Sequence, residues 1–222
     1  MITVACLDMA GTTVADDGTV MTAFTAAMRE QDLPAGRYEE AMKHVLATMG
    51  QSKIEVFRTL LGAEEAAQRA NAAFERHYAA EVTAGRVAPL PGAVETIRRL
   101  RSAGVRVCLA TGFSPATRDA IIGALRWQDE IDLALSPADT VAGRGRPAPD
   151  LPLTALLRLG GGSVAELAVA GDTPSDVESG LRAGAGLVAG VLTGTGTRKD
   201  FEQAGTPLIL ASIADLIPYA AG

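Results

Sequence analysis

Residues 1–14 read MITVACLDMAGTTV, a short apolar run with β-branched residues that ends at Asp8. A run of this length and composition predicts a strand that is buried on both faces. The residues that follow, Ala10–Thr13, are typical of a turn. We therefore expect the chain to begin with a buried strand that places a carboxylate at its carboxyl end.

Short apolar runs alternate with helical patterns in the second part of the chain. The predicted strands cover 105–110, 131–135, 167–170 and 187–192, the predicted helices cover 93–103, 115–126, 150–159 and 174–184, and a last strand–helix pair lies near 207–220. The Thr-Gly repeat at 193–197 is expected to form a flexible loop. Such alternation predicts a parallel sheet with helices on both faces. The fold class is therefore α/β, with a Rossmann-like parallel-sheet core that includes the first strand.

Residues 19–86 have a different pattern, with apolar residues three and four apart and no strand signal. Breaks near Pro34–Gly36 and at Leu61–Gly62 divide this block into about four helices. Since the block lies between the first strand and the others, it is predicted to be an insertion. The expected domains are a core of residues 1–16 and 88–222 and a helical cap of residues 17–87.

Composition limits the function classes. The 222 residues carry 20 basic and 26 acidic side chains, a net charge of −6, which argues against nucleic acid or an anionic membrane as partners. No apolar run is long enough to cross a bilayer, and the N-terminus lacks the basic region of a signal peptide. Cys6 and Cys108 lie in apolar runs and are expected to be buried free thiols. These features predict a soluble, cytoplasmic protein.

Three predicted strands end in polar residues that suit phosphate chemistry. They are followed or terminated by Asp8, by Thr111-Gly112 and by Gly171-Asp172. In open parallel sheets ligands bind at the carboxyl ends of the strands, so these residues are expected to converge. Carboxylate oxygens suit Mg²⁺, and a carboxylate beside the metal can accept a phosphoryl group. The cofactor predicted from this set is Mg²⁺.

Four segments occur in an order that resembles the haloacid dehalogenase superfamily. They are Asp8–Val14 (DMAGTTV), Thr111 after a strand, Arg146–Asp150 (RPAPD) and Gly171–Asp176 (GDTPSD). Taken alone, each has an ordinary structural interpretation: Asp172-Thr-Pro is a good helix start, and the glycines around Arg144 and Arg146 predict an exposed loop. The ordered set covers essentially the whole chain, and the resemblance rests on it.

Within that superfamily the chain is similar to the phosphonatase family of phosphonoacetaldehyde hydrolases. Most superfamily members have a second Asp where this chain has Ala10, and Lys where it has Arg146. Met49-Gly-Gln-Ser-Lys53 matches the phosphonatase Met-Gly-x-x-Lys segment. Cleavage of a carbon–phosphorus bond releases no alkoxide that an acid at position 10 would protonate. It needs an electron sink, which an imine between Lys53 and an aldehyde provides.

The resemblance implies roles around the metal and the nucleophile. Asp8 would accept the phosphoryl group and bind Mg²⁺, with the Ala10 carbonyl and Asp172 completing the metal ligands. Asp176 would support the metal through water or a further hydrogen bond. Arg146 would balance the negative charge, and its exposed-looking loop predicts that Arg146→Ala loses activity while staying folded.

The resemblance also implies the substrate contacts. Thr111 and the Gly112 amide would hold the phosphoryl group, and the other substrate-binding residues would be Gly11, Thr12 and Gly50. Cap closure would bring Lys53 in, with its pKa lowered from about 10.4 by desolvation so that the neutral amine is available. The substrate would be a small phosphonate or organophosphate, and the resemblance suggests a homodimer.

Two departures from phosphonatases leave the substrate open. Val56 stands where those enzymes have histidine, and Phe113 stands where they have tyrosine, so a related 2-oxoalkylphosphonate suits the chain as well as phosphonoacetaldehyde. One alternative is a phosphomonoesterase, such as a phosphoglycolate phosphatase-like enzyme, in which Lys53 only binds substrate. Another is a phosphate-binding regulator without turnover.

Overall fold

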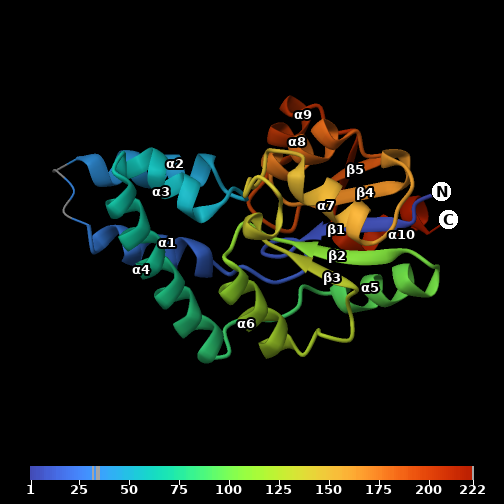
Figure 1. Ribbon diagram of the computed structural model, residues 1–222, viewed down its shortest axis with the longest axis horizontal. Helices are drawn as coiled ribbons and strands as arrows, with labels where there is room; N and C mark the ends of the chain where they lie inside the picture. The colour runs from blue at the N-terminus through green and yellow to red at the C-terminus, as the bar shows by residue number, and fades with distance from the viewer. Residues whose placement is uncertain (32, 34–35, 222) are drawn as a thin grey trace.

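The computed structural model describes residues 1–31, 33 and 36–221, and its six strands form one sheet (Figure 1). The strands are β1 (Val4–Asp8), β2 (Arg106–Ala110), β3 (Leu133–Leu135), β4 (Leu167–Gly171), β5 (Leu187–Val191) and β6 (Leu208–Leu210). Their order is β3-β2-β1-β4-β5-β6, and every adjacent pair is parallel. The predicted α/β fold with a Rossmann-like sheet is confirmed.

The register brings the polar strand ends to one edge of the sheet. Asp8 pairs with Ala110 at the end of β2, and Leu7 pairs with Ala170 near the end of β4. Because β1 lies between β2 and β4, the loops after all three strands emerge side by side. This is the place where the strand order changes direction, at which α/β sheets bind ligands.

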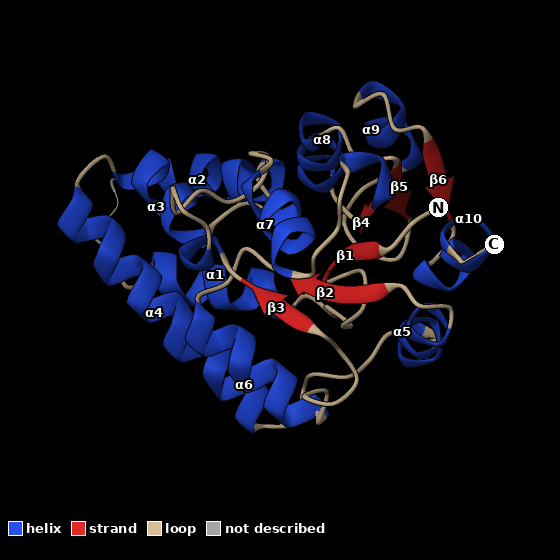
Figure 2. Ribbon diagram, turned by 45° about the vertical axis from the view of Figure 1, so that its right-hand side comes forward, coloured by secondary structure: helices blue, strands red, loops and turns tan. Residues whose placement is uncertain are grey.

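Helices cover both faces of the sheet (Figures 1 and 2). They are α5 (Ala93–Ser102), α6 (Pro115–Leu125), α7 (Asp150–Arg158), α8 (Pro174–Ala183), α9 (Arg198–Gln203) and α10 (Ile217–Ala220). Leu7 packs in the buried cluster that contains Ile97 of α5, whereas Cys6 packs with Leu151 of α7. Alternate residues of β1 therefore face opposite helix layers, which explains why the whole run is apolar.

The two cysteines lie opposite each other in adjacent strands. Cys6 of β1 is in register with Cys108 of β2, and both are buried free thiols, as the sequence predicts. Burial and the neighbouring Cys6 thiol raise the pKa of Cys108 well above its ordinary value, so this thiol stays protonated.

The helices α1 to α4, which follow β1 in the chain, lie together beside the carboxyl edge of the sheet (Figure 1). They are α1 (Thr19–Arg29), α2 (Arg37–Ala47), α3 (Lys53–Leu61) and α4 (Glu64–Thr83). The ring of Phe24 packs 5.2 Å from that of Phe57 and 4.7 Å from that of Phe74, between centroids. None of the helices described in the structure is long and apolar enough to cross a membrane.

The predicted breaks in this block can be compared with the helix ends. Gly62 adopts a left-handed conformation with φ 71° directly after α3, which confirms the break at Leu61–Gly62. The other break falls partly on Pro34 and Ala35, which lie outside the described residues.

The sequence pattern misses several short elements. The helix α9 begins with a capping box in which Thr197 accepts from the Asp200 amide and Asp200 accepts from Thr197. The turn η3 (Ile213–Leu216) falls within the predicted strand–helix pair near 207–220, but the 3₁₀ turns η1 (Pro137–Asp139) and η2 (Val164–Glu166) are also absent from the prediction. All are too short for apolar periodicity to be visible, and they differ from the prediction without changing the topology.

Candidate active site

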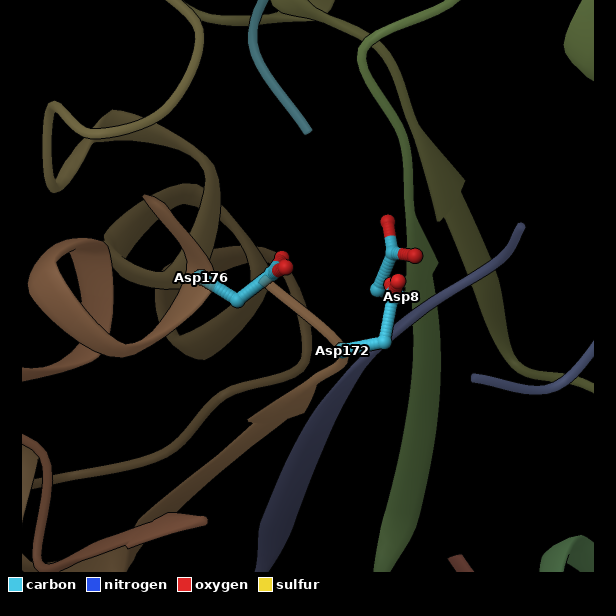
Figure 3. Close-up of side chains that lie close together, drawn as sticks. All are labelled: Asp8, Asp172 and Asp176. Atoms are coloured by element: carbon cyan, nitrogen blue, oxygen red, sulfur yellow. The ribbon is translucent and has the colours of Figure 1, made fainter. Parts of the chain in front are cut away.

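Three buried carboxylates meet at the carboxyl edge of the sheet. Asp8 ends β1, Asp172 follows β4, and Asp176 lies in the first turn of α8. One oxygen from each lies within 4.8 Å of the others, and Figure 3 shows Asp176 pointing from its helix toward the other two. The parallel register and the start of α8 together bring Asp8 next to Asp172 and Asp176, which lie far from it in sequence.

Arg146 joins two of these carboxylates. Its Nη1 donates to Asp8 Oδ1 at 2.5 Å and also to Asp176 Oδ1, while its Nη2 donates to the Ala110 carbonyl at 2.9 Å. Only 6% of Arg146 is exposed, so the expectation of an exposed arginine in this loop is wrong. A guanidinium can be buried here because its donors meet carboxylates and a strand-end carbonyl. The exposed Arg144 pairs instead with Asp150 at 3.0 Å.

Asp176 also holds the loop that carries Asp172. Its Oδ2 accepts from the Thr173 amide at 3.1 Å and from the Thr173 hydroxyl at 2.5 Å, completing a capping box at the start of α8. Asp176, which the resemblance assigns to supporting the metal, thus binds Arg146 and Thr173 in the structure.

Burial and mutual repulsion change the ionisation of the cluster. Burial raises the pKa of Asp8 to about 6, and Asp176 adds to this rise, whereas Arg146 opposes it. Burial, followed by the charges of Asp8 and Asp176, raises the pKa of Asp172 well above its usual range. A divalent cation would relieve this repulsion, and carboxylate oxygens are the donors that Mg²⁺ prefers, so the residues fit a magnesium ion.

The first loop packs directly against Asp172. Thr12 donates its hydroxyl to Asp172 Oδ1 at 3.3 Å, and a Cβ on Gly11 would lie 2.5 Å from Asp172 Oδ2. With φ 87°, Gly11 also needs the left-handed conformation that favours glycine. Ala10, two residues beyond Asp8, pairs with Val14 in a one-residue bridge and has no carboxylate to offer.

The loop after β5 also contributes to the site, which the sequence did not reveal. Thr195 donates its amide to Asp172 Oδ2 at 2.9 Å, and the Thr193 hydroxyl donates to the Gly11 carbonyl at 2.7 Å. Residues 193–197, which the sequence predicts to be a flexible loop, are thus a loop that contacts Asp172 and Gly11. Its position after a strand next to β4 was the signal that could have placed it at the site.

Lys53 lies under the helices, against the loop after β2. It is the first residue of α3 and only 6% exposed. Its amide donates to the Gly112 carbonyl at 3.3 Å, and its Nζ lies 5.1 Å from the ring centroid of Phe113 and 5.6 Å from that of Phe24. Burial, followed by the charge of Arg146, lowers the pKa of Lys53 to about 8, in the direction that the sequence analysis predicts.

Two glycines allow the close approach of this segment to the sheet. A Cβ on Gly112 would collide with the Gln51 carbonyl, and one on Gly50 would collide with the Thr173 side chain. Gly50 also has φ 84°. Thr111, next to Gly112, is buried and accepts the Phe113 amide on its hydroxyl at 3.2 Å. The structure thus brings all the residues predicted for the site to one edge of the sheet.

A cleft of about 310 Å³ opens beside Lys53, between the helices and the sheet. Its walls come from α3 and α4 on one side and from the loops after β2 and β3 on the other: Ser52, Lys53, Ile54, Glu55, Arg58, Asn71 and Glu75, then Gly112, Phe113, Ser114, Pro115, Pro137, Ala138 and Gly143. A second, much smaller cavity of about 10 Å³ lies between Asp8, Arg146 and Leu151 of α7. Lys53 lines the larger cleft, whereas Asp8, Asp172 and Asp176 do not.

Comparison with known proteins adds family information to this geometry. The sequence profile of the haloacid dehalogenase-like hydrolases matches residues 2–184. The chain is 28% identical over 214 residues to phosphonoacetaldehyde hydrolase of Pseudomonas fluorescens (strain SBW25), covering 89% of this chain and 75% of that protein.

Solved structures share the fold. A phosphonoacetaldehyde hydrolase-like protein from Oleispira antarctica matches with a TM-score of 0.80 and 24% identity, covering 99% of this chain and 91% of the other. A phosphoglycolate phosphatase candidate from Lactobacillus delbrueckii subsp. bulgaricus matches with a TM-score of 0.78 and 17% identity, covering 99% and 98%. At these identities the two structures support the fold and no particular substrate.

Proposed function

The chain belongs to the haloacid dehalogenase-like hydrolases, and we propose that it hydrolyses the carbon–phosphorus bond of phosphonoacetaldehyde or a related 2-oxoalkylphosphonate. One observation carries the proposal: Lys53 is buried beside the loop after β2 with its pKa lowered to about 8. Position 10, where a phosphatase of this superfamily needs its acid, holds alanine. A reactive amine without that acid suits imine chemistry better than ester hydrolysis.

The first step joins substrate and enzyme. The neutral amine of Lys53 adds to the aldehyde carbon, and water leaves to give a protonated imine. Phe24 and Phe113 flank the amine and help to keep it desolvated, as its lowered pKa requires. We propose that helices α1–α4, within a cap of residues 17–87, place Lys53 over the core for this step.

The second step breaks the carbon–phosphorus bond. A carboxylate oxygen of Asp8 attacks phosphorus, and the bonding electron pair moves through carbon into the imine, which becomes an enamine. Arg146 stabilises the crowded anions from a distance of 2.5 Å to Asp8. Mg²⁺ held by Asp8, Asp172 and the Ala10 carbonyl would supply further positive charge beside the transferring phosphoryl group.

Water then completes the cycle. It hydrolyses the aspartyl phosphate at Asp8 to inorganic phosphate, and the enamine takes a proton on carbon. Hydrolysis of the resulting imine releases the aldehyde and restores the Lys53 amine. In this scheme Thr111 and Gly112, with Gly11, Thr12 and Gly50, line the path of the phosphoryl group.

A phosphomonoesterase is the second candidate, since structural neighbours include a phosphoglycolate phosphatase candidate. A turnover screen of phosphonoacetaldehyde against phosphoglycolate and other phosphate esters separates the two. We expect phosphate and acetaldehyde to appear in equal amounts from the phosphonate, with little phosphate from the esters. Efficient ester hydrolysis without phosphonate cleavage would reject C–P chemistry, and stoichiometric binding without turnover of either would favour a regulator.

Arg146→Ala is expected to lower kcat by roughly 10²–10³-fold, the range for loss of one well-placed donor to a developing anion. Since Arg146 is buried between Asp8 and Asp176, the substitution also lowers the free energy of unfolding, by about 3–5 kcal/mol as for other broken buried pairs. The exposed Arg144 is the matched control, and Arg144→Ala should change neither quantity much. Steady-state kinetics and urea denaturation measure both. An inactive Arg144→Ala beside a normal Arg146→Ala reverses the assignment.

The rate of imine formation should depend on pH through Lys53. Because the amine reacts only when neutral and its pKa is about 8, the rate should rise about tenfold per pH unit below pH 8 and level off above it. An ordinary lysine would give a midpoint near ~10.4. Single-turnover release of acetaldehyde between pH 6 and 10 measures this profile, and a rate that is flat from pH 6 to 9 is incompatible with the proposed role of Lys53.

A further inference from the structure

Glu75 lies on α4, and its carboxylate accepts hydrogen bonds from residues at the start of α6. Its Oε2 accepts the Ser114 hydroxyl at 2.5 Å and also the Thr117 hydroxyl. Ser114 is the N-cap of α6 and Thr117 lies in the first turn of that helix. A carboxylate at a helix N-terminus is stabilised by the helix dipole, and hydrogen bonds to charged acceptors are stronger than neutral ones. This contact therefore fastens α4 to α6.

The residues next to Glu75 hold the loop that faces Lys53. Phe74 stacks on Phe113 at 6.1 Å, and Tyr78, one turn along α4, packs on Phe113 at 4.6 Å between ring centroids. Phe113 in turn lies 5.1 Å from Lys53 Nζ. The loop 112–114 is thus held from α4 at Phe113 and Ser114, and from α3 at Gly112, which accepts the Lys53 amide.

The contact also has a built-in cost. The other carboxylate oxygen of Glu75, Oε1, is buried and has no hydrogen-bond partner among the described residues. A buried polar atom without a partner has lost its hydrogen bonds to water and gained none in return. The net gain from the attachment is therefore smaller than its two hydrogen bonds alone would give.

We propose that Glu75 is a positioning residue, which fastens the helical insertion to the first turn of α6 and so holds Lys53 against the loop after β2. The proposal rests on the proposed function in giving Lys53 the reacting amine. Without the contact, α3 and α4 separate from this loop, and Lys53 becomes hydrated. Its pKa then returns toward the ordinary value of a lysine, because burial is the main cause that lowers it. The charged groups that also affect the pKa of Lys53 belong to the predicted core, residues 1–16 and 88–222. Arg146 lowers this pKa, whereas Asp8, Asp16 and Asp172 raise it.

The test measures the pKa of Lys53 without catalysis. Amine labelling with acetic anhydride between pH 6 and 11, followed by peptide mass mapping, gives a midpoint for each of the three lysines, with Lys43 and Lys199 as internal references. We expect the Lys53 midpoint to be near 8 in the wild type and at least one pH unit higher in Glu75→Ala. The exposed Glu65 on the same helix is the matched control, and Glu65→Ala should leave the midpoint unchanged.

Substitutions of Thr117, the partner of Glu75 on α6, test the same contact even if Glu75→Ala does not fold. Thr117→Val removes one donor with little change of shape and should raise the midpoint, whereas Thr117→Ser should restore it. The kcat/KM for phosphonoacetaldehyde should fall at least tenfold in Glu75→Ala, and the Glu75→Ala/Thr117→Val pair should be no worse than Glu75→Ala alone.

Two results overturn the positioning role: a Lys53 midpoint that stays near 8 in Glu75→Ala, or effects of the two substitutions that simply add. The outcome for the proposed function is separate. If the midpoint moves as expected but the wild type cleaves no phosphonate, Glu75 still positions Lys53 and the C–P chemistry is wrong. If the wild type cleaves phosphonate and the midpoint does not move, only the role of Glu75 fails.

Discussion

Asp8→Asn is expected to abolish turnover, with kcat lower by roughly 10⁴–10⁶-fold, the range seen when an essential catalytic group is removed. An amide is not a nucleophile toward phosphorus, so no covalent intermediate forms at this position. In the wild type Arg146 donates to Asp8 Oδ1 at 2.5 Å, and the amide oxygen of Asn can accept the same hydrogen bond. The fold should therefore persist. Phosphate release measures the loss, and thermal denaturation checks the fold.

Asp17 is exposed and provides a matched control, because Asp17→Asn makes the same chemical change away from the cluster. It should keep wild-type kcat. Removing the metal tests the same site by another route: activity should vanish in excess chelator and return with Mg²⁺. Asp8→Asn within tenfold of wild type, or activity that chelator leaves unchanged, contradicts the assignment of Asp8 as phosphoryl acceptor and metal ligand.

Lys53→Arg is expected to abolish C–P cleavage, with kcat at least about 10³-fold lower, because arginine keeps the charge but stays protonated and cannot form an imine. Phosphonate binding should remain, since the positive charge stays near the carboxylates. Lys53→Met, which is similar in length and uncharged, covers the case in which the larger guanidinium does not fit the buried position. Single-turnover cleavage and equilibrium binding separate the two effects.

The other two lysines are the natural controls for this substitution. Lys43 on α2 and Lys199 on α9 are exposed, so Lys43→Arg and Lys199→Arg should behave as wild type. A Lys53→Arg enzyme that retains most of its cleavage rate would mean that Lys53 only binds substrate, as in the phosphomonoesterase alternative.

The sheet and the carboxylate cluster were predictable from local patterns. A short apolar run with β-branched residues such as Val4–Leu7 favours a buried strand, and the carboxyl ends of parallel strands meet at one edge. That rule alone brings Asp8 and Asp172 together, as the register of β1 with β4 shows. The left-handed turn at Gly62 is likewise a local property of glycine.

Three features of the site depend on contacts between segments that are distant in sequence, so local patterns could not predict them. Gly-rich sequence around Arg144 and Arg146 looks exposed, and only the positions of Asp8 and Asp176 decide which arginine is buried. The environment of Lys53 is set by Phe113 and Gly112, about 60 residues away in sequence. The contact of Thr195 with Asp172 depends on the order of β4 and β5, which composition does not encode.

Reductive trapping tests the central claim most directly. Phosphonoacetaldehyde and borohydride are added to the enzyme, and the protein is then digested and mapped by mass spectrometry. Reduction converts an imine into a stable secondary amine, so the proposed mechanism predicts the added mass on Lys53 and none on Lys43 or Lys199, together with loss of activity. If the enzyme keeps its activity and Lys53 remains unmodified while phosphonate is being turned over, the imine mechanism is wrong for this protein.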